Sequence, residues 1–116
     1  MKKNKFSKNW IIKQKRDLYV KKSKLEGYRS RAVYKLQEIN DKFKIIKNNI
    51  LVVDLGAAPG SWSQYISRNF KNSKIISIDL KDIEPIKNVT HIIGDFTDEN
   101  EKLKIQNYFR KKVDLI

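Results

Sequence analysis

The sequence predicts an α/β protein built on a parallel sheet. Three short runs rich in Ile, Val and Leu have the length and composition of strands, at residues 49–55, 74–80 and 90–93. Helical patterns follow the first and the third run, an alternation that produces parallel strands joined by right-handed crossovers. With 116 residues, 40% of them hydrophobic, the chain is long enough for one small domain with a packed core.

Two helices are expected before the first strand. Residues 9–26 have a loose helical pattern, which Gly27 ends. Ser30 is a good N-cap for a second helix over residues 31–43. Lys35 falls at the edge of the apolar stripe of this helix, so its ammonium group can reach a cleft beside the core. The stripe itself is formed by Ala32, Leu36, Ile39 and Phe43.

The remaining elements follow the first strand in turn. A glycine turn at residues 56–60 opens a helix that runs to about residue 70. After the third strand, Thr97 or Asp98 can cap a helix that runs to about residue 111. Residues 113–116 then begin a fourth strand. Because a parallel strand buried on both faces is not expected at the end of a finished domain, we interpret the chain as the N-terminal part of a larger domain, truncated after the start of this strand.

Positive charge is concentrated in the first half of the chain. Residues 1–49 contain 16 Lys and Arg against 4 acidic residues, whereas residues 50–116 contain 10 against 9. Lysine and arginine meet phosphates while aromatic rings stack on bases, so we expect RNA or DNA as the partner rather than a merely solvated segment. We therefore divide the chain into a basic nucleic-acid-binding extension, 1–28, and the α/β part, 29–116. The aromatic residues interleaved with the charge are Phe6, Trp10, Tyr19, Tyr28 and Tyr34.

Composition also excludes several kinds of site. The chain has no cysteine, which excludes disulfides and thiolate metal sites, and a single histidine, which excludes a histidine metal cluster, so we expect no metal. That histidine, His91, is interpreted as a surface strand residue without a role. No apolar run approaches the ~18 residues that span a bilayer, and no signal-peptide core follows the basic start. We therefore expect a cytoplasmic protein without membrane contact.

The glycine turn is the strongest local signal for a ligand. It joins a strand to a helix, where glycine lets the backbone approach a bound molecule. Its sequence, G-A-A-P-G, lacks both the G-x-G-x-x-G spacing of dinucleotide sites and the Lys-Ser/Thr pair of a P-loop. This pattern favours a ligand that has an adenosine but no phosphate groups.

Two aspartates follow the next two strands. Asp79 ends the second strand, where a carboxylate can accept both ribose hydroxyls of a nucleoside. Asp95 follows the third strand and can accept a hydrogen bond from an adenine amino group. Ligands of open α/β sheets bind at the carboxyl ends of the strands, so the turn and both aspartates are expected together at that edge.

These residues belong to a longer pattern that resembles a known family. Residues 29–39 read R-S-R-A-V-Y-K-L-Q-E-I around Lys35, and residues 54–64 read D-L-G-A-A-P-G-S-W-S-Q. The stretches 79–80 and 94–98 match as well. From Trp10 to Ile116 the chain is similar to the FtsJ/RrmJ (RlmE) family of ribosomal RNA large subunit ribose 2′-O-methyltransferases. The matching residues of the leader are Trp10, Asp17, Tyr19 and Val20.

The resemblance implies a fold, a function and a set of site residues. The fold is a Rossmann-like S-adenosylmethionine-dependent methyltransferase sheet, in which the cofactor would be bound by Gly60, Trp62, Asp79 and Asp95. Lys35 would be the first member of a Lys-Asp-Lys-Glu catalytic set whose later members this chain lacks. The implied reaction is 2′-O-methylation of a uridine ribose in 23S ribosomal RNA of the large (50S) subunit, by a cytoplasmic monomer whose residues 1–28 bind RNA.

Two departures and two alternatives accompany this interpretation. Ser61 stands where the family usually has a second Gly, and Gln14 stands where a His is common. The chain can instead be a noncatalytic RNA- or nucleoside-binding remnant of such an enzyme, which a true stop after Ile116 favours. A dehydrogenase-like nucleotide binder is the weaker alternative, because the G-x-G-x-x-G spacing is absent. Trp62 can also be a residue of the hydrophobic core without a ligand contact, although the family pattern favours contact with the cofactor.

Overall fold

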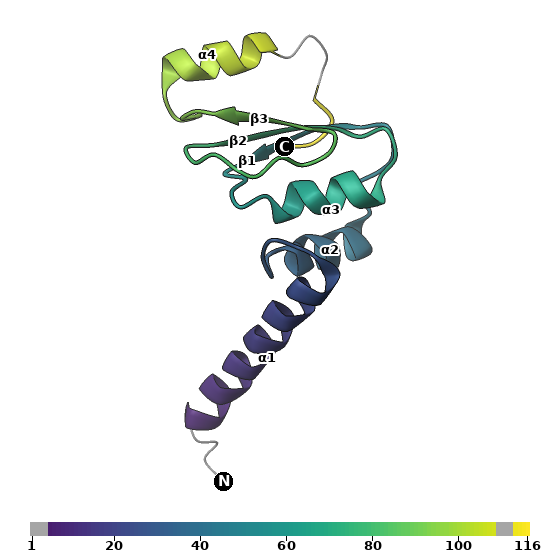
Figure 1. Ribbon diagram of the computed structural model, residues 1–116, viewed down its shortest axis with the longest axis vertical. Coiled ribbons are helices and arrows are strands. Elements are labelled where there is room, and N and C mark those ends of the chain that lie inside the picture. Colours follow the sequence, from purple (N-terminus) through teal and green to yellow (C-terminus); the bar gives the residue numbers. More distant parts are fainter. Residues whose placement is uncertain (1–4, 109–112) are drawn as a thin grey trace.

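The computed structural model describes residues 5–108 and 113–116 (Figure 1). The expected alternation of strands and helices is present, so the fold belongs to the α/β class that the sequence predicts. No helix in this described part is long and apolar enough to cross a membrane. In chain order the elements are α1 (Lys5–Glu26), α2 (Val33–Phe43), β1 (Leu51–Leu55), α3 (Ser61–Asn69), β2 (Lys74–Asp79), β3 (Val89–Ile93) and α4 (Glu99–Tyr108).

The three strands form one parallel sheet in the order β1-β2-β3. The register pairs Val52 with Ile75, and Ile75 with Val89, so the apolar runs lie side by side. Close to the end of the chain, Leu115 forms a parallel bridge with Val52, on the side of β1 that β2 leaves open. The start of the expected fourth strand therefore lies next to β1.

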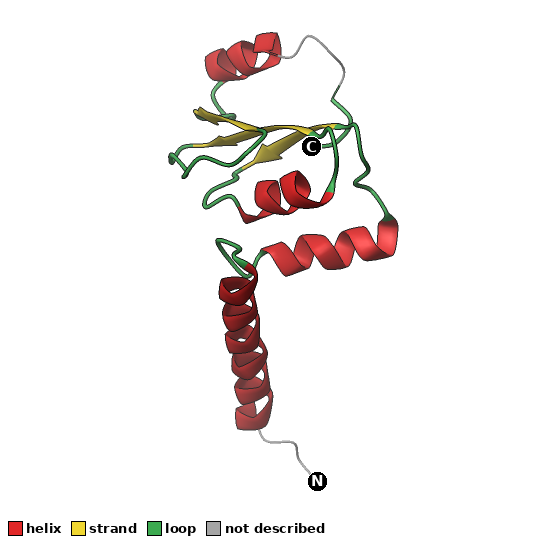
Figure 2. Cartoon of the chain, turned by 45° about the vertical axis from the view of Figure 1, so that its right-hand side comes forward, coloured by secondary structure: helices red, strands yellow, loops and turns green. Residues whose placement is uncertain are grey.

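Helices cover the two faces of the sheet unequally (Figure 2). α2 and α3 lie on one face and α4 lies on the other. The α4 face has a small buried cluster, formed by Val53, Ile76 and Ile78. The α2/α3 face has the larger cluster, which joins the first turn of α2 and the middle of α3 to β1 and β2. Its buried members are Val33, Tyr34, Leu36, Ile46, Val52, Tyr65, Ile66 and Ile75.

α1 extends away from the rest of the molecule, and its C-terminal end is the part that reaches α2 (Figure 1). Ser23 is buried at this end, and its carbonyl accepts the backbone N–H of Tyr28 at 2.8 Å. Gly27 ends the helix with a φ of 74°, as the sequence predicts. Before this end of the helix, Trp10 and Leu18 are 60% and 65% exposed, so the projecting part of α1 presents apolar as well as basic side chains to solvent.

The start of α2 differs from the prediction. The helix begins at Val33, and Ala32 occupies the N-cap position without a side-chain hydrogen bond. Ser30 does not cap it, because its hydroxyl bonds the hydroxyl of Ser61 at the start of α3, at 2.8 Å. The buried stripe is also rotated: Val33 is buried, whereas Phe43 is 63% exposed. Packing against α3 thus overrides the local signals for the cap and the apolar face.

The start of α4 agrees with the prediction. The Oδ1 atom of Asp98 accepts the backbone N–H groups of Asn100 at 2.9 Å and of Glu101 at 3.2 Å. These are the first groups of the helix that lack a helical partner, so Asp98 is its N-cap. The expected end of this helix, at about residue 111, lies outside the described residues.

Candidate cofactor site

Backbone hydrogen bonds tie the ends of the three strands together. The N–H groups of Gly56 and Ala57 both donate to the carbonyl of Ile78, at 2.8 and 3.2 Å. The N–H of Gly94, just after β3, donates to the carbonyl of Asp79 at 3.0 Å. The glycine turn and the residues that end β2 and follow β3 therefore lie along one edge of the sheet, where the sequence predicts a ligand site.

Gly60 and Gly56 shape the turn for different reasons. Gly60 has a φ of 109°, and a Cβ atom added there would lie 2.9 Å from Cδ1 of Ile86 and 3.2 Å from Nη1 of Arg29. Gly56 has a φ of 69°, but a Cβ atom added there would meet nothing within 4 Å. Gly60 thus allows the turn to approach neighbouring segments closely, whereas Gly56 faces open space.

Beside the turn lies a cavity of about 220 Å³. Of the predicted site residues, Trp62 lines it. The Trp62 side chain is 36% exposed, and its indole N–H donates to the carbonyl of Ala32 at 2.7 Å. Trp62 is therefore part of the cavity wall and not a buried core residue. The lining residues are Ser30, Ala32, Asp54, Leu55, Gly56, Ala57, Ala58, Pro59, Ser61 and Trp62.

Asp79 ends β2, and both of its carboxylate oxygens accept backbone N–H groups. Oδ1 accepts from Lys81 at 2.9 Å and Oδ2 from Ala58 at 3.0 Å. These two bonds favour the ionised form and hold the pKa of Asp79 below its ordinary value. Each oxygen keeps further acceptor capacity, so the carboxylate can still accept hydroxyl groups of a ligand. Because Ala58 lines the cavity, Asp79 also fixes one of its walls.

Asp95 follows β3 at the same edge. Its Oδ1 atom accepts the hydroxyl and the backbone N–H of Thr97, and these bonds hold the pKa of Asp95 below its ordinary value. Its own backbone N–H donates to Oε2 of Glu101 on α4. The carboxylate is therefore ionised near neutral pH, with the acceptor capacity of Oδ2 left for a ligand.

Asp54 lines the cavity too, and the sequence analysis did not single it out as a site residue. Its Oδ2 atom accepts the hydroxyl of Ser63 on α3 at 2.7 Å. Burial raises the pKa of Asp54, and the bond from Ser63 opposes this shift. The available signal was one acidic residue in the otherwise apolar strand β1. In its ionised form this carboxyl group can pair with a cationic group of a ligand, and in its protonated form it can donate a hydrogen bond.

Arg29 joins the segments around the site. Its guanidinium group donates to the carbonyl of Pro59 in the glycine turn at 3.0 Å. It also donates to the carbonyls of Glu84 and Pro85, between β2 and β3, at 2.6 and 3.0 Å. Its backbone N–H donates to Oε1 of Gln64 on α3 at 2.9 Å. Sequence spacing does not reveal such a side chain, because its partners lie 30 to 56 residues away.

Lys35 is less closely joined to this edge than the resemblance implies. It is exposed on the first turn of α2 and is not among the residues that line the cavity. Its backbone N–H donates at 3.2 Å to the carbonyl of Ala32, which also accepts the indole N–H of Trp62. The structure therefore brings Lys35 within one helical turn of the cavity wall without placing its ammonium group in the cavity.

His91, which the sequence analysis interprets as a surface strand residue without a role, makes two hydrogen bonds within the fold. His91 is partly buried on β3, with Nδ1 2.7 Å from the hydroxyl of Ser77 and Nε2 2.9 Å from the carbonyl of Lys81. A carbonyl only accepts, so Nε2 carries the hydrogen, and in the neutral ring Nδ1 accepts from Ser77. His91 thus holds the segment that follows Asp79 against β3, a contact that arises from strand register and not from local sequence.

Comparison with known proteins decides the family. The model of the FtsJ-like methyltransferases matches residues 28–116, which is most of the chain. The chain belongs to the FtsJ-like methyltransferase family. The resemblance predicted from the motifs around Lys35 and Gly60 is therefore confirmed.

Individual relatives of this FtsJ-like chain carry the name Ribosomal RNA large subunit methyltransferase E. One from Pelagibacter ubique (strain HTCC1062) is 60% identical over 116 residues, and one from Legionella pneumophila (strain Corby) is 45% identical over 118 residues. Each match covers 100% of this chain but 57% of the relative, so the chain spans little more than half the length of these curated relatives. A crystal structure from Plasmodium falciparum, described as a ribosomal RNA methyltransferase, matches with a TM-score of 0.63 and 39% identity, over 73% of this chain and 51% of that one.

Proposed function

We propose that this chain acts in the S-adenosylmethionine-dependent 2′-O-methylation of a uridine ribose in 23S ribosomal RNA of the large subunit. The proposal rests on one edge of the sheet, where Asp79 and Asp95 lie at tied strand ends. The glycine turn that Gly60 ends lies at the same edge, beside the cavity that Trp62 lines. The names of the curated relatives supply the substrate class, ribosomal RNA of the large subunit. The proposal includes a cytoplasmic location, a monomeric state and RNA contact through residues 1–28.

The residues of this edge fit S-adenosylmethionine. When bound, this cofactor supplies an electrophilic methyl group carried by a sulfonium sulfur. Ionised Asp79 has acceptor capacity for two ribose hydroxyls, and Asp95 has Oδ2 for an adenine amino group. The open space at Gly56 and the carboxyl group of Asp54 can take a cationic end of the ligand. The lack of a phosphate-binding pattern in the turn agrees with a ligand that has no phosphates.

Lys35 is proposed to act on the RNA side of the reaction. Bound S-adenosylmethionine would supply the methyl group to the ribose 2′-oxygen, and the hydroxyl proton would pass to a base or to solvent. A positive charge close to the 2′-oxygen stabilises the negative charge that develops there. Lys35 is one helical turn from the cavity wall, and Trp62 holds that turn through the carbonyl of Ala32. The further Asp, Lys and Glu of the implied catalytic set would have to come from another segment.

Asp79 offers the most direct test of the cofactor assignment. Asp79→Ala removes a charged acceptor, and calorimetric titration with S-adenosylmethionine is expected to show binding weakened about tenfold or more. Asp82→Ala is the matched control, because among the described residues the Asp82 carboxylate accepts one hydrogen bond, from the neighbouring N–H of Ile83 at 2.8 Å. Equal affinities of the two variants would contradict the assignment.

The second candidate is a noncatalytic RNA- or nucleoside-binding protein of the same family. One observation favours it: Lys35 is not among the residues that line the cavity. An assay of labelled methyl transfer to large ribosomal subunits lacking the modification separates the candidates. We expect no transfer from the 116-residue chain alone and clear transfer when it is extended to the length of its relatives. Transfer by the short chain would rule out the noncatalytic candidate, and absence of transfer by the extended chain would support it.

A further inference from the structure

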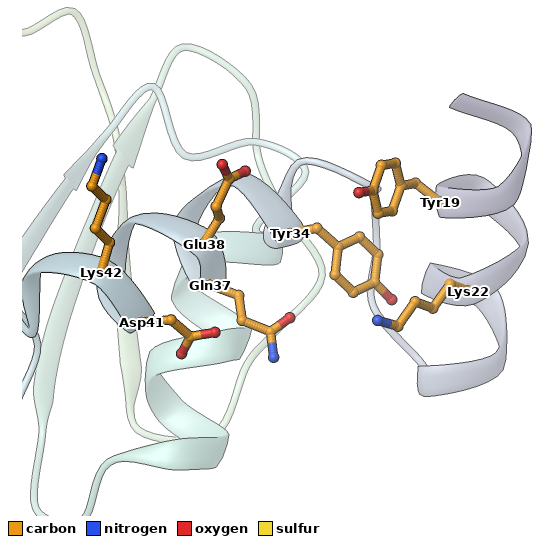
Figure 3. Close-up of a pocket in the computed structure, with 7 residues that line it drawn as sticks. All are labelled: Tyr19, Lys22, Tyr34, Gln37, Glu38, Asp41 and Lys42. Atoms are coloured by element: carbon orange, nitrogen blue, oxygen red, sulfur yellow. The ribbon is translucent and has the colours of Figure 1, made fainter. Parts of the chain in front are cut away.

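A second cavity, of about 500 Å³, lies between α1 and α2 (Figure 3). We call it the α1–α2 groove, and it shares no lining residue with the cavity at the glycine turn. The proposed cofactor site therefore makes no use of it. Its lining residues are Tyr19 and Lys22 from α1, and Tyr34, Gln37, Glu38, Asp41 and Lys42 from α2.

We propose that the α1–α2 groove binds an unpaired nucleobase of the RNA substrate, and specifically a base that has an exocyclic amino group. This inference rests on the proposed function, because it takes the partner to be RNA. It adds a base-binding subsite that is separate from the place of methyl transfer.

The groove contains a preformed aromatic surface. The rings of Tyr19 and Tyr34 are stacked, with centroids 5.4 Å apart and an angle of 28° between their planes. Tyr34 is 8% exposed and its hydroxyl donates to Oε2 of Glu26 at 2.9 Å, so this ring is fixed in place. Tyr19 is 47% exposed and is the ring on which a base can stack. Because Tyr34 already supports Tyr19, little ordering of the side chain is needed when a base binds.

The charges in the groove favour a base in its middle and phosphates at its ends. Figure 3 shows Lys22 and Lys42 at opposite ends of the labelled residues, with Glu38 and Asp41 between them. Carboxylates repel phosphates but accept hydrogen bonds from base amino groups, such as N4 of cytosine. Adenine, cytosine and guanine have such a group and uracil does not. In the free chain Lys22 lies over the Tyr34 ring and 3.9 Å from Glu26, and Lys42 lies over the Phe43 ring. Both side chains are exposed, so they can turn towards the phosphates on either side of a bound base.

Regularly spaced lysines lie on α1 and on α2, on either side of the groove. Lys8, Lys15 and Lys22 recur every seven residues, so they lie on one face of α1 at intervals of about 10 Å. Lys22 is part of the groove. On α2, Lys35 and Lys42 are likewise seven residues apart and share a face. An RNA strand that follows these lysines passes the groove on its way to Lys35, and this charge pattern is why we choose RNA as the occupant.

Stacking is tested by fluorescence anisotropy with the 116-residue chain and labelled oligocytidine. Tyr19→Leu is expected to weaken binding about fivefold or more, whereas Tyr19→Phe, which keeps the ring, is expected to bind like the unchanged chain. Phe43→Leu is the matched control, because Phe43 is an exposed aromatic residue of α2 that does not line the groove. Equal binding by Tyr19→Leu and Phe43→Leu would overturn the groove as a base site while leaving RNA binding intact.

Specificity is tested by replacing oligocytidine with oligouridine, a pyrimidine without the amino group. The unchanged chain is expected to bind oligocytidine about threefold or more tightly than oligouridine. Glu38→Ala/Asp41→Ala is expected to bring this ratio close to one. Equal affinity of the unchanged chain for both oligonucleotides would overturn the proposed class of base. No binding of either by the unchanged chain would instead overturn the proposed function itself.

Discussion

At the glycine turn, side chains from distant segments hold the backbone in place, whereas the projecting part of α1 is exposed to solvent. Arg29 alone bonds three carbonyls from two loops, and Asp79 bonds two backbone N–H groups. In α1, by contrast, Trp10 and Leu18 keep more than half of their surface exposed. Substitutions in the first region should therefore change the stability of the chain, and those in the second should change only what the chain binds.

The largest effect on stability is expected for Gly60→Ala. The left-handed φ of 109° and the crowding by Arg29 and Ile86 should together reduce the free energy of unfolding by about 1–3 kcal/mol. Gly56→Ala is the control, since its added Cβ meets nothing within 4 Å and only the backbone strain remains. Denaturant unfolding of both variants measures the difference. A Gly56 variant at least as destabilised as the Gly60 variant would contradict this account.

A smaller effect is expected for Arg29→Lys. The lysine keeps the charge but cannot bond Pro59, Glu84 and Pro85 at once, so stability should fall by about 1–2 kcal/mol. Hydrogen exchange should quicken in the glycine turn and in the segment between β2 and β3. Arg31→Lys, the same change at an exposed neighbour, should leave both quantities unaltered. Similar exchange in the two variants would show that Arg29 does not hold the loops together.

Asp54→Asn should have an effect that depends on pH. Burial raises the pKa of Asp54 above its ordinary value of 3.8, so folding favours the protonated carboxyl group. The contribution of Asp54 to the stability of the unchanged chain is greatest below pH 3.8, and it is lost as the pH rises through the pKa that Asp54 has in the folded state. The variant should therefore gain stability relative to the unchanged chain as pH rises, as measured by melting temperatures across this range.

Asp79→Asn should behave in the opposite way. The pKa of Asp79 is lowered, so the stability from its ionised form is present above pH 3.8 and is lost as the pH falls through the folded-state pKa. The variant should be less stable than the unchanged chain near neutral pH, and the difference should shrink in acid. The same sign of pH dependence in the Asp54 and Asp79 variants would contradict both assignments.

No effect on stability is expected for Lys8→Gln/Lys15→Gln. Both lysines are exposed on the projecting part of α1, so the free energy of unfolding should change by less than about 0.5 kcal/mol. The dependence of RNA affinity on salt should nevertheless flatten, by about 0.7 in the logarithmic slope for each phosphate that the variant no longer neutralises. Lys71→Gln/Lys74→Gln, at exposed sites of the sheet-bearing part, is the control. An equal decrease of the slope in both pairs would show that α1 does not bind the RNA.

The sequence was informative where a residue acts through its own neighbours. The turn at Gly60, the cap at Asp98, the end of α1 at Gly27 and the position of Asp79 at the end of β2 all follow from local rules, and the structure agrees with them. The family was likewise predictable, because its motifs are continuous stretches around Lys35 and Gly60.

The remaining features depend on contacts between distant segments. Ser30 looked like a cap but bonds Ser61, and Phe43 looked like a core residue but is exposed, because α2 turns a different side towards α3. The bonds of Arg29 and His91 reach partners that only the folded sheet brings close. No periodicity or motif contains this information, so these roles could not be inferred before the packing was known.

The bridge between Val52 and Leu115 has a consequence for the order in which the chain folds. Paired residues of β1 and β2 are 23 positions apart, whereas Leu51 and Asp114, bonded across the other side of β1, are 63 apart. Closing the longer loop costs about 1 kcal/mol more in chain entropy, so the β1-β2-β3 ladder is expected to form first. Until Leu115 arrives, the outer side of β1 presents unpaired N–H and C=O groups to any other strand. During synthesis a second chain can therefore compete with Leu115 for the outer side of β1, which makes this edge one site at which self-association can begin.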